Sequence, residues 1–148
     1  MLEMKAYDPD YVASCRARDE SQVGVFHEVV MAARSHGDDG SDLESAVDSL
    51  ESEYFNNMLI VLEGYFVYRM RELEGTDGNA LNEVRLIAAS LLKNGGTVME
   101  DPELTLDPAR SVLGLAVGDS VQLTAQQYRS VSDAFFRQIE RRFTDTRS

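Results

Sequence analysis

One carboxylate stands in the middle of the most apolar stretch of this sequence. Residues 54–70 are apolar on nearly every helical face, and Glu63 lies near their centre. A helix that is apolar all round must be enclosed by protein or by lipid. A buried acid either pairs with a cation from another segment or keeps its proton through a raised pKa. Because acids with perturbed pKa values collect in polar pockets, Glu63 is the first candidate for chemistry.

The cation that matches Glu63 must come from elsewhere, because no basic residue lies three or four positions away in the sequence. Arg85 is the preferred partner, since its helix follows a short turn and is expected to pack back antiparallel. His27 and Arg34 are the alternatives. Two interpretations remain open: a closed ion pair between helices, or an open polar pocket. The candidate residues for lining such a pocket are Asn56, Glu63, Tyr65, Asn82, Arg85 and His27.

A second group of polar residues lies where a helix is expected to begin, between Asp77 and Arg85. The free N–H groups at a helix start can hold an anion. Capping by Asp77 or Asn79 explains part of this pattern without any ligand. Capping does not explain the presence of Asn82 and Arg85, because alanine has a higher helix propensity than either residue. Contacts to a neighbouring helix are the favoured interpretation, and a ligand is the alternative.

No catalytic signature accompanies these residues. The sequence lacks a nucleophile elbow and a phosphate-binding glycine loop, and its two histidines, His27 and His36, are nine positions apart. The acid-rich segment 38–44 lacks the residue order of an EF-hand loop. The pattern therefore predicts no metal and no cofactor, and it disfavours an enzyme.

Charge and cysteine content narrow the class of protein. The net charge of −12 disfavours nucleic acid and anionic membranes as partners. The longest uninterrupted apolar run of the central stretch, residues 58–62, is far too short to span a membrane. Cys15 is the only cysteine, so the chain is not a disulfide scaffold and a reducing cytoplasm is the expected compartment.

Apolar spacing predicts an all-α fold, a bundle of four to five helices around one long central helix. Asp8 followed by Pro9 marks the first helix start, and the polar run 19–22 is expected to divide the N-terminal helical region in two. Ser41 and Glu44 fit a capping box before the central helix. The expected helical segments are 7–36, 42–74, 79–94 and 124–143.

Residues 97–123 differ in character from the rest. They hold Pro102 and Pro108 together with short β-prone pieces, which predicts an irregular insert or a two-stranded β ribbon. The last helix cannot bury its aromatic face alone, so residues 1–148 are expected to form one domain.

Two functions are compatible with these features. The first is a non-catalytic interaction or regulatory module that acts through self-association or a protein partner. The alternative is a small-ligand-binding protein or enzyme with a polar pocket around Glu63. The apolar central stretch is suited to half of a symmetric interface, and two-fold dimers are the commonest assemblies. We therefore expect a homodimer.

Overall fold

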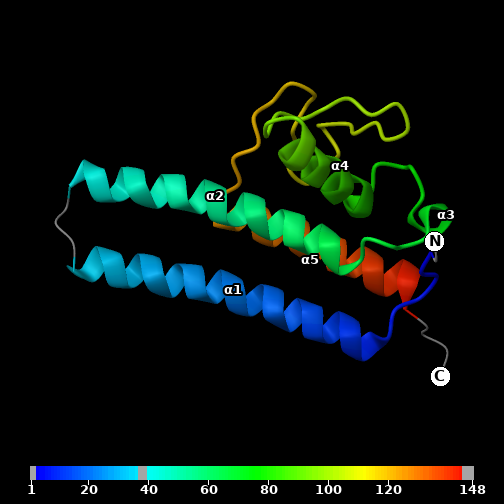
Figure 1. Ribbon diagram of the computed structural model, residues 1–148, viewed down its shortest axis with the longest axis horizontal. Coiled ribbons are helices and arrows are strands. Elements are labelled where there is room, and N and C mark those ends of the chain that lie inside the picture. Colours follow the sequence, from blue (N-terminus) through cyan, green and yellow to red (C-terminus); the bar gives the residue numbers. More distant parts are fainter. Residues whose placement is uncertain (1–2, 37–39, 145–148) are drawn as a thin grey trace.

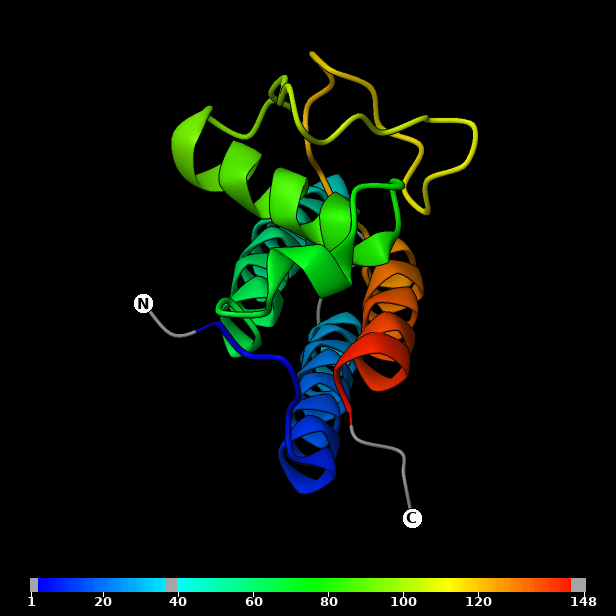
Figure 2. The same cartoon turned by 90° about the vertical axis from the view of Figure 1, so that its right-hand side faces the viewer.

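Three long helices and one shorter helix form the body of the protein. The computed structural model describes residues 3–36 and 40–144, and these residues form helices and no strand. Viewed end-on, α1, α2 and α5 form a triangle, and α4 crosses over α2 and α5 (Figure 2). The predicted all-α class is confirmed. The helices are α1 (Pro9–His36), α2 (Ser41–Tyr65), α3 (Arg71–Glu74), α4 (Ala80–Lys93) and α5 (Ala125–Phe143).

Helix starts follow the capping residues in the sequence at three places. The Asp8 carboxylate accepts the backbone N–H of Asp10 at 2.8 Å where α1 begins. Asn79 accepts the N–H of Leu81 at 2.8 Å at the start of α4. Thr124 forms a reciprocal capping box with Gln127 at the start of α5. These side chains satisfy N–H groups that lack partners within the helix.

The predicted break in the N-terminal helical region is wrong, because α1 runs without interruption from Pro9 to His36. Asp19 occupies a position on the buried face between Cys15 and Val23, and it is itself buried. Hydroxyl groups of α5 donate hydrogen bonds to its carboxylate. The polar run 19–22 is therefore helical, and its first residue, Asp19, belongs to the core because it has polar partners there.

The predicted central helix over 42–74 is also wrong at its C-terminal end, because α2 stops at Tyr65. Phe66, fully buried, leaves the helical conformation with φ −133° and ψ 34°. The chain then pairs with the N-terminal segment, where the Met4 N–H donates to Tyr68 O at 2.7 Å and Met4 O accepts from Met70 N–H at 2.8 Å. The tertiary contacts at both ends of this turn stabilise it more than a continuation of α2 through residues 66–73 would stabilise the chain.

The predicted N-cap of the central helix is one residue late, because Gly40 and not Ser41 is the N-cap of α2. Glu44 pairs with Arg34 of α1, with 2.8 Å between Oε1 and Nη2. This ion pair joins the last turn of α1 to the first turn of α2, and the two helices run side by side (Figure 1). Residues 37–39 of the predicted loop lie outside the described residues.

The insert between α4 and α5 is irregular and does not form the alternative two-stranded ribbon. A single antiparallel bridge joins Thr97 to Ser120. Asn56 of α2 and Glu83 of α4 hold this segment through hydrogen bonds to its backbone. Asn56 donates to Val121 O at 2.8 Å and accepts the N–H of Leu123 at 3.1 Å. The buried carboxylate of Glu83 accepts two further backbone N–H groups, those of Val112 and Leu113, at 2.9 and 2.8 Å.

The core lies inside the triangle of α1, α2 and α5 and beneath α4. Phe66 is fully buried in this core, and its ring meets those of Tyr7 and Phe136 edge-on at centroid distances of 4.8 and 6.0 Å. Such edge contacts add to the burial of apolar area. None of the helices in the described part of the chain is sufficiently long and apolar to cross a lipid bilayer.

Replacing Asn56 with alanine is expected to destabilise the protein by about 1–3 kcal/mol, because two backbone groups of the insert lose their partner. Urea denaturation measures the loss, and hydrogen exchange at Leu123 should accelerate. Asn57→Ala, at the exposed neighbouring position, is the matched control and should change stability little. Equal losses of stability in the two variants would show that Asn56 does not hold the insert in place.

Candidate functional site

A buried ionic cluster lies where the end of α2 meets α3 and α4. Arg69 contacts two acids, with 2.9 Å from Nη1 to Glu63 Oε1 and 2.9 Å from Nε to Glu74 Oε1. Arg85 of α4 approaches the same acids, at 2.5 Å from Glu74 and 3.9 Å from Glu63. Two guanidinium groups and two carboxylates thus neutralise one another within the fold.

Arg69 holds the centre of this ionic cluster, and its side chain is 0% exposed. Its guanidinium donates hydrogen bonds to Phe66 O at 3.2 Å and to Leu81 O at 3.0 Å, and it lies 5.4 Å from the ring centroid of Phe135. The ion-paired atoms Arg69 Nε and Glu63 Oε1 lack hydrogen-bond alignment, so those contacts are electrostatic. Arg69 therefore ties the end of α2 to the first turn of α4 and to α5.

Glu74 receives the more complete set of partners. Arg85 donates to both of its oxygens, and Asn82 donates to Oε2 at 2.8 Å. Asn82 also donates to Gly75 O at 3.0 Å and accepts the N–H of Gly78 at 2.9 Å. The turn between α3 and α4 is thereby wrapped around this carboxylate. The Arg142 guanidinium adds a hydrogen bond to the backbone oxygen of Glu74 at 2.6 Å.

The two acids of the cluster have opposite pKa shifts. Burial raises the pKa of Glu63, although the charges of Arg69 and Arg85 partly offset that effect. Burial also opposes ionisation of Glu74, but the hydrogen bonds from Arg85 and the charge of Arg69 outweigh it and hold the pKa of Glu74 below its ordinary value. Glu74 is therefore the firmly ionised member, whereas Glu63 retains a stronger affinity for a proton.

The structure brings together three of the six residues predicted to line a pocket. Glu63 and Arg85 lie within ion-pair distance, and Asn82 joins them through Glu74. The other three lie elsewhere. Asn56 clamps the insert, Tyr65 accepts a hydrogen bond from Tyr11 through its backbone oxygen, and His27 lies on α1 in a separate groove. The alternative cation Arg34 pairs with Glu44.

Sequence reasoning missed Arg69 and Glu74. Both belong to the stretch that was interpreted as the end of one long helix, on which Arg69 would point away from Glu63. The sequence carried no signal for this turn, because apolar residues continue at helical spacing through Tyr68, Met70 and Leu73. In the structure Val67, Tyr68 and Leu73 are exposed, so that spacing does not mark a buried helical face.

The closed form of the ionic cluster limits its chemistry. The side chains of Glu63 and Arg85 are only 12% and 20% exposed, and those of Arg69 and Glu74 are 0% exposed. Their charged ends contact one another. An ionic cluster of this kind orients helices and sets local rigidity, as structural ion-pair networks do.

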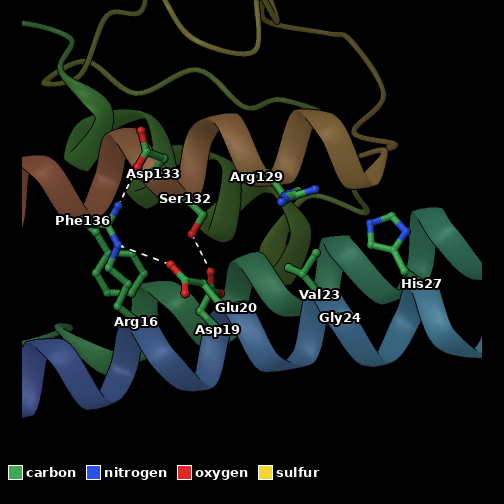
Figure 3. A pocket seen from close by; sticks show the side chains of 10 residues that line it. All are labelled: Arg16, Asp19, Glu20, Val23, Gly24, His27, Arg129, Ser132, Asp133 and Phe136. Carbon is green, nitrogen blue, oxygen red and sulfur yellow. Dashed lines mark hydrogen bonds and ion pairs between the residues drawn. The ribbon is translucent and has the colours of Figure 1, made fainter.

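A more open polar site lies in the groove between α1 and α5 (Figure 3). It encloses about 370 Å³. Arg16 crosses one end of the groove and pairs with Asp133 at 2.5 Å and with Glu140 at 2.7 Å. Arg129 and His27 lie together at the other end (Figure 3). We call this site the α1–α5 groove.

Asp19 forms part of the groove wall although its residue is only 5% exposed. Tyr128 donates a hydrogen bond to one carboxylate oxygen, and Ser132 donates to the other at 2.6 Å. Burial raises the pKa of Asp19, and these two hydrogen bonds offset part of the effect. No cation lies within ion-pair distance of this carboxylate among the described residues.

No protein-family model, curated protein or solved structure matches this chain. Within residues 3–36 and 40–144, no group of three or more histidine, cysteine or acidic side chains is arranged to hold a metal ion. The site must therefore be interpreted from its own geometry.

Arg69→Met is expected to destabilise the protein by about 3–5 kcal/mol, because it strands two buried carboxylates. The penalty should shrink at low pH, where those acids take up protons. Urea denaturation measures both effects. Arg71→Met, at a more exposed position, is the control, and a similar loss there would show that the ionic cluster is not responsible.

The stability contributed by Asp19 is expected to fall as pH rises. Between its ordinary pKa and its raised pKa in the folded state, the unfolded chain has released the proton while the folded chain keeps it. Stability therefore falls as pH rises through this window.

Comparing wild type with Asp19→Asn by denaturation between about pH 3 and 7 isolates this contribution. The variant should gain stability relative to wild type with rising pH. The exposed control Asp48→Asn should show no such trend. A trend of opposite sign for Asp19→Asn would mean that the neutral form is not favoured.

Proposed function

We propose that the protein is a non-catalytic interaction module that self-associates through one face of the α1–α2 hairpin. This open face is the side of the two helices turned away from α5, which passes behind α2 in Figure 1. Contacts across it join Tyr54 to Gln22 O and Arg18 to the ring of Tyr65. The open face comprises Tyr11, Arg18, Gln22, Val25, Val29, Leu43, Leu50, Tyr54, Val61 and Tyr65.

Exposed apolar side chains on the open face carry this proposal. Val25 and Val29 are 48% and 52% exposed, and Leu50 and Val61 are 43% and 47% exposed. On α2, Leu43 and Leu50 are separated by seven residues, as are Tyr54 and Val61. Repeats of seven place side chains along one seam, which is the pattern that helices use to pack against a partner helix.

The lack of charge on the open face favours a second copy of this chain as the partner. Arg18 is the one charged residue of the ten, in a protein whose net charge is −12. Depletion of charge is typical of the buried centre of an interface. Two copies of an acidic protein repel one another least where both surfaces are uncharged.

Gly64 is consistent with a helix approaching this region of α2. It is exposed, and a Cβ added there would meet no other atom within 4 Å. Glycine within a helix costs about 1 kcal/mol relative to alanine. A partner helix that packs close to the backbone would give this glycine a role that the single chain does not.

The proposed assembly is a two-fold dimer in which two α1–α2 hairpins pack face to face. Such an interface is self-complementary, because each hairpin presents the same residues to the other. The result is a four-helix interface, which buries the seam that each hairpin leaves exposed.

A non-catalytic role is supported by the closed geometry around Glu63. The alternative, a ligand pocket or active site at that residue, finds less support because the neighbouring guanidinium groups occupy the space around its carboxylate. The ionic cluster is better suited to holding α2 and α4 in place than to receiving a substrate.

Val61→Glu should convert a dimer into a monomer, or weaken dimerisation by more than about tenfold, by placing a charge at the interface. Sedimentation-velocity ultracentrifugation of the full chain over a range of concentrations measures this change. Leu92→Glu is the matched control, because Leu92 is a 65% exposed residue of α4 outside the open face.

The control should remain dimeric, and circular dichroism should show that both variants fold. A wild-type chain that stays monomeric at high micromolar concentration would rule out self-association. A dimer that is insensitive to Val61→Glu would place the interface elsewhere.

A further inference from the structure

The insert between α4 and α5 contains a loop whose two ends are bonded to each other. The N–H of Val98 donates to Asp119 O at 2.9 Å, and the N–H of Gly118 donates to Val98 O at 2.9 Å. This closed base resembles that of an Ω loop, a kind of loop that is frequently functional. We call residues 100–117 the α4 cover, because they lie over α4 on the side turned away from α2 (Figures 1 and 2).

The base of the α4 cover is fastened to two helices. On one side of the cover, Ser90 Oγ of α4 accepts the N–H of Met99 at 2.9 Å. On the other side, Asn56 of α2 forms hydrogen bonds with Val121 and Leu123. All of these bonds lie outside residues 100–117, so the cover can move as a unit while its base stays in place.

The body of the α4 cover has one hydrogen-bonded attachment to the helices. Among the described residues, only Glu83 supplies it, by accepting the N–H groups of Val112 and Leu113 at 2.9 and 2.8 Å. The other hydrogen bonds of residues 100–117 stay within the insert. Leu104 is the one buried side chain of the cover.

The α4 cover hides one stripe of α4. Glu83, Leu86 and Ser90 are spaced by three and four residues, which places them on one face of the helix, and all three are buried. Glu83 and Ser90 both form hydrogen bonds with the insert, so this face is turned toward it. Opening of the cover would therefore expose Leu86 between a carboxylate and a hydroxyl group.

We propose that the α4 cover opens and closes over this stripe, and that Glu83 is the latch that keeps it closed. Connections longer than about 12–15 residues without secondary structure are uncommon in compact domains, and lids are among their usual roles. This one runs from the end of α4 at Lys93 to the start of α5 at Ala125. A segment with few bonds to the rest of a protein opens at a lower free energy than global unfolding.

The latch is strong but small. Hydrogen bonds to an ionised carboxylate are stronger than those between neutral groups, so two of them suffice to hold the body of the cover. Both end on the same side chain, so the loss of that one carboxylate releases Val112 and Leu113 together.

Alkylation of engineered thiols by iodoacetamide, followed by mass spectrometry, tests for the opening. Cys15→Ala removes the only cysteine of the chain. In that background, Leu86→Cys places a thiol beneath the cover. Leu59→Cys is the matched control, because Leu59 is a fully buried residue of α2 in the core. The thiol of Leu86→Cys should react at least about tenfold faster, since opening of the cover does not require global unfolding.

Glu83→Gln tests the latch. The amide keeps the shape of the side chain but offers one acceptor oxygen in place of two. This substitution should accelerate alkylation of Leu86→Cys by about tenfold or more and leave that of Leu59→Cys unchanged. Glu100→Gln is the matched control, because Glu100 is exposed within the cover, and it should change neither rate.

Three outcomes would overturn the proposal. Equal alkylation of Leu86→Cys and Leu59→Cys would show that α4 is uncovered only by global unfolding. An unchanged rate in Glu83→Gln, or equal acceleration at both thiols, would show that Glu83 is not the latch. If Glu83→Gln does not fold, the urea dependence of alkylation in Leu86→Cys decides: local opening gives a weak dependence, whereas the full dependence of global unfolding contradicts the cover.

Discussion

Burial of the Arg69 guanidinium is the interaction on which the rest of the structure depends. An unmatched charge inside a protein costs several kcal/mol, so this side chain must have partners on every side. Glu63 and Glu74 supply the charges, and backbone oxygens of Phe66 and Leu81 accept its remaining hydrogen bonds. These contacts fix the end of α2 against the first turn of α4.

The same principle governs the other buried polar groups. Asp19 joins α1 to α5 through two hydroxyl groups, and Glu83 holds two backbone N–H groups of the insert. Each buried acid has a different kind of partner: guanidinium groups, hydroxyl groups or peptide N–H groups. The kind of partner does not by itself set the direction of the pKa shift. Hydrogen bonds from Arg85 and Asn82 together with the charge of Arg69 lower the pKa of Glu74, whereas burial raises the pKa of Glu63 despite its two guanidinium neighbours. Burial likewise raises the pKa values of Asp19 and Glu83.

The two surfaces of α1 differ in charge. Toward the outer side of α2, the helix is almost without charge and presents valines. Toward α5 it presents Arg16, Glu20 and His27 around a groove. An uncharged face suits association with another apolar face, so self-association is proposed for the outer side.

Several features were determined by the sequence alone, because they depend on neighbours along the chain. Asp8, Asn79 and Thr124 mark helix starts because their side chains reach N–H groups two or three residues away. The all-α class follows from apolar periodicity, and the buried state of Glu63 follows from its apolar surroundings in the sequence.

The tertiary structure alone decided which distant residues meet. The helical spacing of residues 66–73 predicted a continuous α2, but pairing with Met4 and burial of Arg69 made the chain turn. The sequence predicted a helix break at Asp19. In the structure Tyr128 and Ser132, more than a hundred residues away, donate hydrogen bonds to it, and the helix continues. Helix propensity and apolar spacing reflect only the preferences of one segment of the chain. The partners of a buried charge come from other segments, and their contribution exceeds local preference at these two positions.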